Sequence, residues 1–189
     1  MTDGTGNGFT RRGLLAAFAA TAVTAAPYYA HASGFLRRSG DIRRLQVYSA
    51  RTGERMDAVY WIEGEYVPEV VAEISHFMRD WRDNTSQPFD TRALDIMAAA
   101  HRLLEVNEPY NLLSGFRSQR TNNILRSRSR NVAQNSLHLR AQAADLRLRS
   151  RSVAQMGRAA AALNAGGVGR YSRSNFVHMD CGPVRNWGA

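Results

Sequence analysis

The sequence predicts an α+β domain in which helices pack on a small antiparallel sheet. Its 189 residues are enough for one domain with a hydrophobic core, and 44% of them are hydrophobic while 22% are charged. Short β-prone runs and longer runs with helical periodicity follow one another along the chain, without an internal repeat. These features together predict a single globular domain that contains both types of element.

The first 32 residues predict an export signal. Arg11 and Arg12 precede an apolar, alanine-rich stretch at 14–26, and Ala30-His31-Ala32 offers a small-x-small cleavage site. This order is typical of a signal peptide, and the paired arginines indicate the twin-arginine route. The apolar stretch is short for a membrane span, although retention as an uncleaved N-terminal anchor stays an alternative. We therefore expect a periplasmic or otherwise extracytoplasmic mature protein with no stable membrane span.

The remaining chain divides into a lead-in and a domain. Residues 33–44 are rich in glycine, serine and arginine and are expected to form a flexible lead-in, so that the domain occupies 45–189. Two β-prone runs, 45–49 and 58–62, flank the turn-forming residues at 51–54. This pattern predicts a β-hairpin at the start of the domain.

Four segments have helical features. Apolar residues recur at helical spacing in the first two, the third is polar, and the fourth is a strong helical segment. The expected helices are 67–81, 91–105, 121–129 and 152–164. Asp90 or Thr91 can cap the second, and two glycines at 166–167 end the fourth. Two further segments, 136–148 and 176–181, are expected to be extended.

The chain is strongly basic, with a formal net charge of +9, and all 25 of its basic residues are arginine. Such a charge suits nucleic acid, but it suits an anionic cell wall or membrane equally well. The arginines are mostly scattered, and no aromatic platform of the kind that single-strand binding needs accompanies them. Together with the export signal, this pattern argues against nucleic acid as a partner.

Metal-binding chemistry must come from histidine and carboxylate side chains, because Cys181 is the only cysteine. His138 and Asp145 are seven residues apart, which is about 10.5 Å on one helix. Two ligands of one zinc each lie about 2 Å from the metal, so a continuous helix cannot bring this pair together. Two extended segments joined by a turn can, with Leu146 and Leu148 facing the core and Asp145 the opposite face.

A second candidate element is the short apolar strand expected at 176–181. Alternation places Val177 and Met179 on one face, and Phe176, His178 and Asp180 on the other. An ionisable pair on one face of an apolar strand suggests a site. From these residues alone, a structural histidine beside a surface aspartate is the favoured interpretation and a site is the alternative.

Several motifs resemble the M15 metallopeptidases, which include D-alanyl-D-alanine carboxypeptidases and murein endopeptidases. The stretch from Ser136 to Asp145, SLHLRAQAAD, is similar to the family signature S-x-H-x-x-G-x-A-x-D. The segments 114–118, 166–171 and 176–180 resemble the branch of that family that contains murein endopeptidase K. The resemblance covers about residues 40–189.

The resemblance implies a zinc-dependent peptidase that cleaves peptidoglycan stem or cross-link peptides during cell-wall remodelling. It implies that His138, Asp145 and His178 hold Zn²⁺ and leave a fourth position for water, whose pKa the metal lowers. Arg117 matches a family arginine that contacts substrate, with a surface ion pair as the alternative. Ser136 is expected to belong to the same substrate-binding site.

Two positions depart from the family pattern. Ala141 replaces the signature glycine, and its methyl group could crowd the site or disfavour a positive φ. Asn175 replaces an acidic general base, and an amide cannot take a proton from water at neutral pH. Asp180 either substitutes for that base or orients His178. The departure at Asn175 favours an alternative function, a catalytically weak zinc-binding protein that serves as a binding or scaffold module in the cell wall.

Overall fold

The computed structural model describes residues 42–129 and 132–188. The expected signal peptide at 1–32, and the expected lead-in up to residue 41, lie outside the described residues. The strands are β1 (Ile42–Tyr48), β2 (Arg55–Ile62), β3 (Glu65–Tyr66), β4 (Tyr110–Ser114), β5 (Ala143–Arg147), β6 (Gly167–Tyr171), β7 (Phe176–Asp180) and β8 (Arg185–Gly188). The helices are α2 (Pro68–Phe77), α3 (Thr91–Leu103), α4 (Gln119–Arg128) and α5 (Val153–Ala162), with two short 3₁₀ helices, η1 (Leu137–Arg140) and η2 (Ser172–Ser174).

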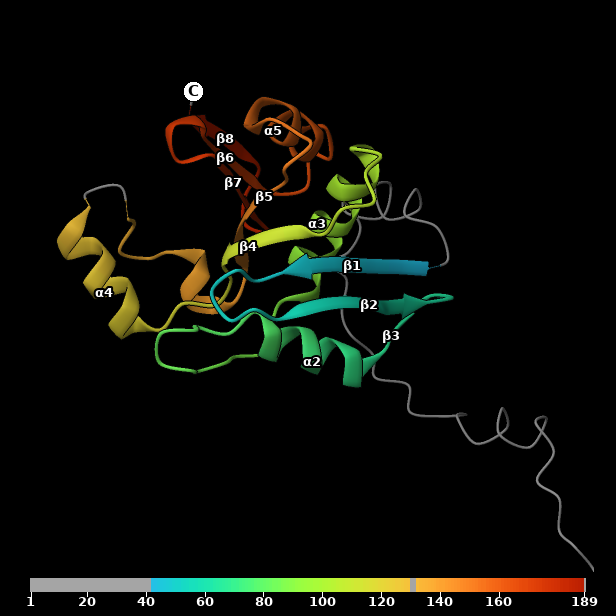
Figure 1. The fold of residues 1–189 in the computed structure, drawn as a ribbon, viewed down its shortest axis with the longest axis horizontal. Helices are drawn as coiled ribbons and strands as arrows, with labels where there is room; N and C mark the ends of the chain where they lie inside the picture. The colour runs from blue at the N-terminus through green and yellow to red at the C-terminus, as the bar shows by residue number, and fades with distance from the viewer. Residues whose placement is uncertain (1–41, 130–131, 189) are drawn as a thin grey trace, which may run out of the picture. The chain divides into compact units, whose positions relative to one another are not determined.

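The α+β class is confirmed, but the expected antiparallel sheet is wrong in type and size. One sheet of eight strands runs in the order β3-β2-β1-β4-β5-β7-β6-β8 (Figure 1). The β1–β4 and β6–β8 pairs are parallel and the other pairs are antiparallel. Parallel neighbours need a long connection, here α2 and α3 between β1 and β4, and local periodicity does not reveal such a partner.

The hairpin expected at the start of the domain is confirmed by the antiparallel pairing of β1 with β2. Strand β1 begins at Ile42, so three residues assigned to the lead-in belong to the sheet. Among the described residues, no helix is both long enough and apolar enough to cross a membrane.

Helices α3 and α5 begin where the sequence provides caps. The side chain of Asp90 accepts from the backbone N–H of Arg92 at the start of α3, and Ser152 forms a capping box with Gln155 at the start of α5. The first helix is shorter than expected, because α2 ends at Phe77. The carbonyl of the next residue, Met78, instead accepts from the backbone N–H of Phe116 at 2.7 Å, which ties this end of the helix to the loop after β4.

The extended segment expected at 136–148 is only partly correct. Its first part is the 3₁₀ helix η1, which carries His138, and only β5 is a strand. Ala141 ends η1 with a φ of 52° in the left-handed region, so the alanine keeps the positive φ that a glycine would provide. At this residue the chain reverses direction and continues from η1 into β5.

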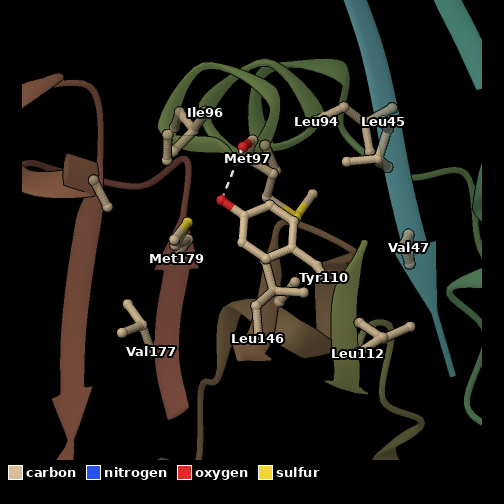
Figure 2. Close-up of a cluster of buried hydrophobic side chains, with 14 of the residues drawn as sticks. Leu45, Val47, Leu94, Ile96, Met97, Tyr110, Leu112, Leu146, Val177 and Met179 are labelled. Atoms are coloured by element: carbon tan, nitrogen blue, oxygen red, sulfur yellow. Dashed lines mark hydrogen bonds between the residues drawn. The ribbon is translucent and has the colours of Figure 1, made fainter. Parts of the chain in front are cut away.

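The hydrophobic core lies between one face of the sheet and helices α3 and α5. Side chains from β1, β4, β5 and β7 meet α3 there, and Tyr110 donates its hydroxyl hydrogen to the carbonyl of Met97 at 3.2 Å (Figure 2). Leu146, Val177 and Met179 point into this core, as the alternation predicted. Asp145, next to Leu146, and His178, between Val177 and Met179, therefore lie on the opposite face of the sheet.

Candidate metal centre

Three elements bring the predicted ligands together. His138 lies on η1, Asp145 on β5 and His178 on β7, and the last two residues are directly opposite each other in the antiparallel β5–β7 pair. Among the described residues, these three form the only group of histidine, cysteine and acidic side chains with metal-binding geometry. The register of two neighbouring strands therefore fixes two of the three side chains.

The three facing atoms form a small triangle. His138 Nε2 lies 3.2 Å from Asp145 Oδ1 and 3.2 Å from His178 Nδ1, and His178 Nδ1 lies 2.9 Å from Asp145 Oδ1. Tetrahedral zinc with bonds of about 2.0–2.1 Å separates its ligand atoms by about 3.3 Å. The triangle thus fits one face of a zinc tetrahedron and leaves the fourth direction open.

Hydrogen bonds on the far side of each imidazole fix which nitrogen faces the triangle. His138 Nδ1 lies 2.7 Å from the carbonyl oxygen of Gly115, and His178 Nε2 lies 2.9 Å from Asp180 Oδ2. Since these partners accept hydrogen bonds, each ring carries its N–H there and turns a lone pair toward the triangle. This is the arrangement that a metal-binding histidine requires.

The electrostatics of the cluster favour a cation. Burial would raise the pKa of Asp145, but His138 and His178 hold it well below its usual range. Burial lowers the pKa of His138. Burial also opposes the charged form of His178, yet hydrogen bonds with Asp145 and Asp180 raise its pKa to about 9. Two ionised carboxylates beside two imidazoles therefore favour positive charge at the centre.

Asp180 lies behind His178 and is fully buried. Its Oδ1 accepts from the backbone N–H groups of Gly167 and Gly182, and Arg185 donates to both of its oxygens. Burial would raise its pKa, but hydrogen bonds from His178 and Arg185 lower it to about 2. A carboxylate with this many donors is suited to orienting His178 rather than to taking up a proton.

Arg117 lies against Asp145. Its Nη2 is 3.6 Å from Asp145 Oδ2, the oxygen that does not face the triangle, and it also donates to Ser114 Oγ at 3.2 Å. Nη1 donates to Asn122 Oδ1 at 3.3 Å, and burial lowers the pKa of the guanidinium. The alternative of a surface ion pair does not fit this geometry, because only 7% of the residue is exposed.

A cavity of about 310 Å³ opens over the triangle. Arg117 and Ser136 line it, and the side chain of Ser136 does not cap η1. Asn175 is not brought to the ligands: it is exposed, has a φ of 53° at the end of η2, and is absent from the residues that line the cavity. Its neighbours Ser174 and Phe176 do line it.

The cavity also contains two aromatic residues to which the sequence analysis gave no role, Tyr171 and Trp187. Tyr171 ends a motif that was compared with the family, so its position was marked but its chemistry was not. Trp187 is the next-to-last described residue, and only the spacing of the glycines in β6 could have indicated a partner for a large ring.

Comparisons with known proteins identify the family of this chain. A family model described as peptidoglycan L,D-endopeptidase MepK matches residues 37–187. The peptidoglycan L,D-endopeptidases MepK of Escherichia coli strain K12 and of Shigella flexneri are each 41% identical over 145 residues, covering 77% of this chain and 80% of theirs. A probable peptidoglycan L,D-endopeptidase MepK of Haemophilus influenzae is 33% identical over 146 residues, covering 77% of this chain and 78% of its own. The chain therefore belongs to the M15 peptidases, in the peptidoglycan L,D-endopeptidase MepK family.

Proposed function

We propose that this chain is a zinc-dependent endopeptidase that hydrolyses L,D peptide bonds in peptidoglycan cross-links. The bond type rests on the relatives of this chain, which are named as peptidoglycan L,D-endopeptidases. The observation that carries it is the triangle of His138 Nε2, Asp145 Oδ1 and His178 Nδ1, which has the dimensions of a three-ligand zinc site under an open cavity.

The residues of the chain prepare this site in advance. Gly115 and Asp180 hold the two imidazoles in the tautomers that leave a lone pair facing the centre. Arg117 holds the second oxygen of Asp145, so that the carboxylate binds through one oxygen. Bound zinc would supply a water of lowered pKa and would polarise the scissile carbonyl.

The substrate is bound by the residues around the triangle. We propose that Arg117 and Ser136 contact the peptide, because both line the cavity beside the ligands. A guanidinium donates well to carbonyl and carboxylate oxygens, and both groups are frequent in peptidoglycan peptides. The cavity has arginine at two points, Arg117 and Arg185, which suits substrates that carry carboxylates.

One observation favours the alternative function of a catalytically weak, zinc-binding cell-wall protein. Among the described residues that line the cavity, the only carboxylate is Asp145, which the proposal uses as a ligand. Asp180, the substitute base considered from the sequence, is buried behind His178. A protein of this kind would hold zinc and bind the wall but would turn over slowly.

Digestion of purified sacculi tests the two functions against each other. The chain should carry one zinc, release fragments with cleaved L,D bonds as identified by mass analysis, and lose this activity with a chelator. His138→Ala should lose both zinc and activity, whereas the exposed His76→Ala should keep both. Zinc binding and sacculus binding without any released fragment would support the scaffold function instead.

We also propose that the protein is exported by the twin-arginine route and acts in the periplasm. The support is the sequence pattern at 1–32 and the location of peptidoglycan. N-terminal sequencing of extracytoplasmic protein should begin after Ala32, and the double change Arg11→Lys, Arg12→Lys should block export. A mature protein that begins at Met1 would contradict cleavage of the signal.

A further inference from the structure

The cavity contains an aromatic pair that metal binding does not explain. Trp187 on β8 donates its indole Nε1–H to the hydroxyl oxygen of Tyr171 at 3.1 Å. The indole also lies against the ring of His178, with the centroids 5.3 Å apart. The Tyr171 hydroxyl is therefore separated from a metal ligand by the width of one side chain, and both aromatic residues line the same cavity as the triangle.

Strand β6 is shaped to hold Trp187 in this position. Gly169 is opposite His178 in the antiparallel β6–β7 pair and opposite Trp187 in the parallel β6–β8 pair. A Cβ atom at Gly169 would lie 2.5 Å from the indole ring, so the ring can lie against the strand only because this residue is glycine. The guanidinium of Arg185, fixed by Asp180, also contacts the indole at 4.9 Å from its centroid.

The ring of Tyr171 is held as firmly as its hydroxyl. It stacks on Phe176 with the centroids 4.4 Å apart and the planes at 12°. Because Trp187 donates to the hydroxyl oxygen, the hydroxyl hydrogen points away from the indole. Tyr171 lines the same cavity as Arg117 and the three residues of the triangle. A phenol held in this way is a preorganised hydrogen-bond donor toward a bound substrate.

Building on the proposed function, we propose that Tyr171 is a catalytic residue and Trp187 a positioning residue. The Tyr171 hydroxyl donates a hydrogen bond to the scissile carbonyl oxygen as that oxygen becomes negative. In this step a water oxygen adds to the carbonyl carbon, and the carbonyl π electrons move onto its oxygen. The C–N bond then breaks, and the leaving amine takes a proton that came from the water. Tyr171 keeps its own proton and stabilises charge only.

The substitution Tyr171→Phe tests the catalytic role, because it removes the hydroxyl and keeps the ring that stacks on Phe176. We expect kcat on a cross-linked muropeptide to fall on the order of a hundredfold, with KM and zinc content unchanged. A phosphinate peptide, whose tetrahedral oxygens imitate the developing charge, should lose affinity by a similar factor in calorimetry. The affinity for the cleaved product peptide should stay the same.

The substitution Trp187→Phe tests the positioning role, because it keeps an aromatic ring and removes the indole N–H. We expect a smaller loss of kcat, about fivefold, again without loss of zinc. Tyr48→Phe and Trp81→Phe are matched controls outside the cavity and should behave like the wild type. If Trp187→Phe also behaves like the wild type, Trp187 does not position the hydroxyl.

The outcomes separate this inference from the proposed function. Equal kcat and equal phosphinate affinity in Tyr171→Phe would overturn the catalytic role and leave the peptidase function in place. Loss of zinc from Tyr171→Phe would overturn it too, because the residue would then support the ligands. A wild-type protein that neither cleaves a muropeptide nor binds the phosphinate removes the proposed function and this inference together.

Discussion

Asp180 fixes the tautomer and the orientation of the His178 ring. It is fully buried, accepts from His178 Nε2 at 2.9 Å, and is held in turn by Arg185. We predict that Asp180→Ala lowers zinc affinity about 10- to 100-fold, because the ligand histidine loses the partner that fixes its tautomer and orientation. Competition with a chromogenic chelator measures this affinity directly.

Added zinc distinguishes orientation by Asp180 from proton transfer. If Asp180 orients His178, saturating zinc should restore much of the activity of Asp180→Ala. Retention of zinc at wild-type affinity together with abolished activity would instead identify Asp180 as the general base. Asp57→Ala serves as the control, since Asp57 is an exposed aspartate that also pairs with an arginine, Arg44.

Asn175 presents the sharpest difference between a motif and a position in space. The family pattern leads to the hypothesis that Asn175→Asp restores a general base and raises activity about tenfold or more. Asn175 is exposed and is not among the residues that line the cavity, which favours unchanged activity. Both residues tolerate the positive φ of this position, so the fold should survive. Muropeptide turnover at equal zinc content decides between the two outcomes.

At the scale of the element, β6 determines whether the aromatic pair can form. Gly169→Ala would place a methyl group against the indole of Trp187, which is held by its neighbours. We predict a loss of about 1–3 kcal/mol in the free energy of unfolding, the usual cost of an extra methyl group in a packed site. Activity should fall as well, since the indole must move away from Tyr171. Urea unfolding and muropeptide turnover measure the two effects.

Gly157→Ala, in helix α5, is the matched control for Gly169→Ala. A Cβ there would lie 2.7 Å from Cγ and Cδ of Arg170, so this side chain, unlike the indole ring, must shift by rotating about its own bonds. Gly157 lies within α5, where alanine is preferred over glycine by up to about 1 kcal/mol. Unfolding at equal or higher urea with normal activity is expected. Equal destabilisation by the two substitutions would show that β6 is not specially fitted to Trp187.

The elements also show what sequence could and could not predict. The capped helices α3 and α5 and the β1–β2 hairpin were predicted correctly, because their signals are local. The 3₁₀ helix η1 was missed, since its geometry depends on a left-handed Ala141 that alternation does not reveal. The two parallel pairings were missed because their partners are far apart in the chain.

At the scale of the whole molecule, the candidate site was easier to predict than the sheet that carries it. Motif spacing identified His138, Asp145 and His178, and the structure brings these three together. Motif spacing could not identify Trp187, whose position results from the pairing of β8 with β6. Short motifs record which side chains are needed, whereas the contacts around them arise from tertiary packing.

The proposed ligands join parts of the domain that are distant in sequence, so metal binding should stabilise the whole fold. His138, Asp145 and His178 come from η1, β5 and β7, and Arg117 adds the loop after β4 by donating its backbone N–H to the carbonyl of His138 at 3.1 Å. A ligand that binds only the folded state, present at a hundred times its Kd, stabilises by about 2.7 kcal/mol. In a domain of this size that corresponds to a shift in Tm of roughly 5–10 °C.

We therefore predict that a chelator lowers the Tm of the wild-type protein by roughly 5–10 °C and that added zinc reverses the change. Calorimetry with and without chelator measures the shift. His138→Ala and His178→Ala should melt at the same temperature in both conditions, because neither can complete the triangle, while His76→Ala should respond like the wild type. A chelator shift that persists in His138→Ala would place the stabilising metal elsewhere. No shift in the wild type would mean that the triangle holds no metal under these conditions, and the assignment of zinc to this site would fail.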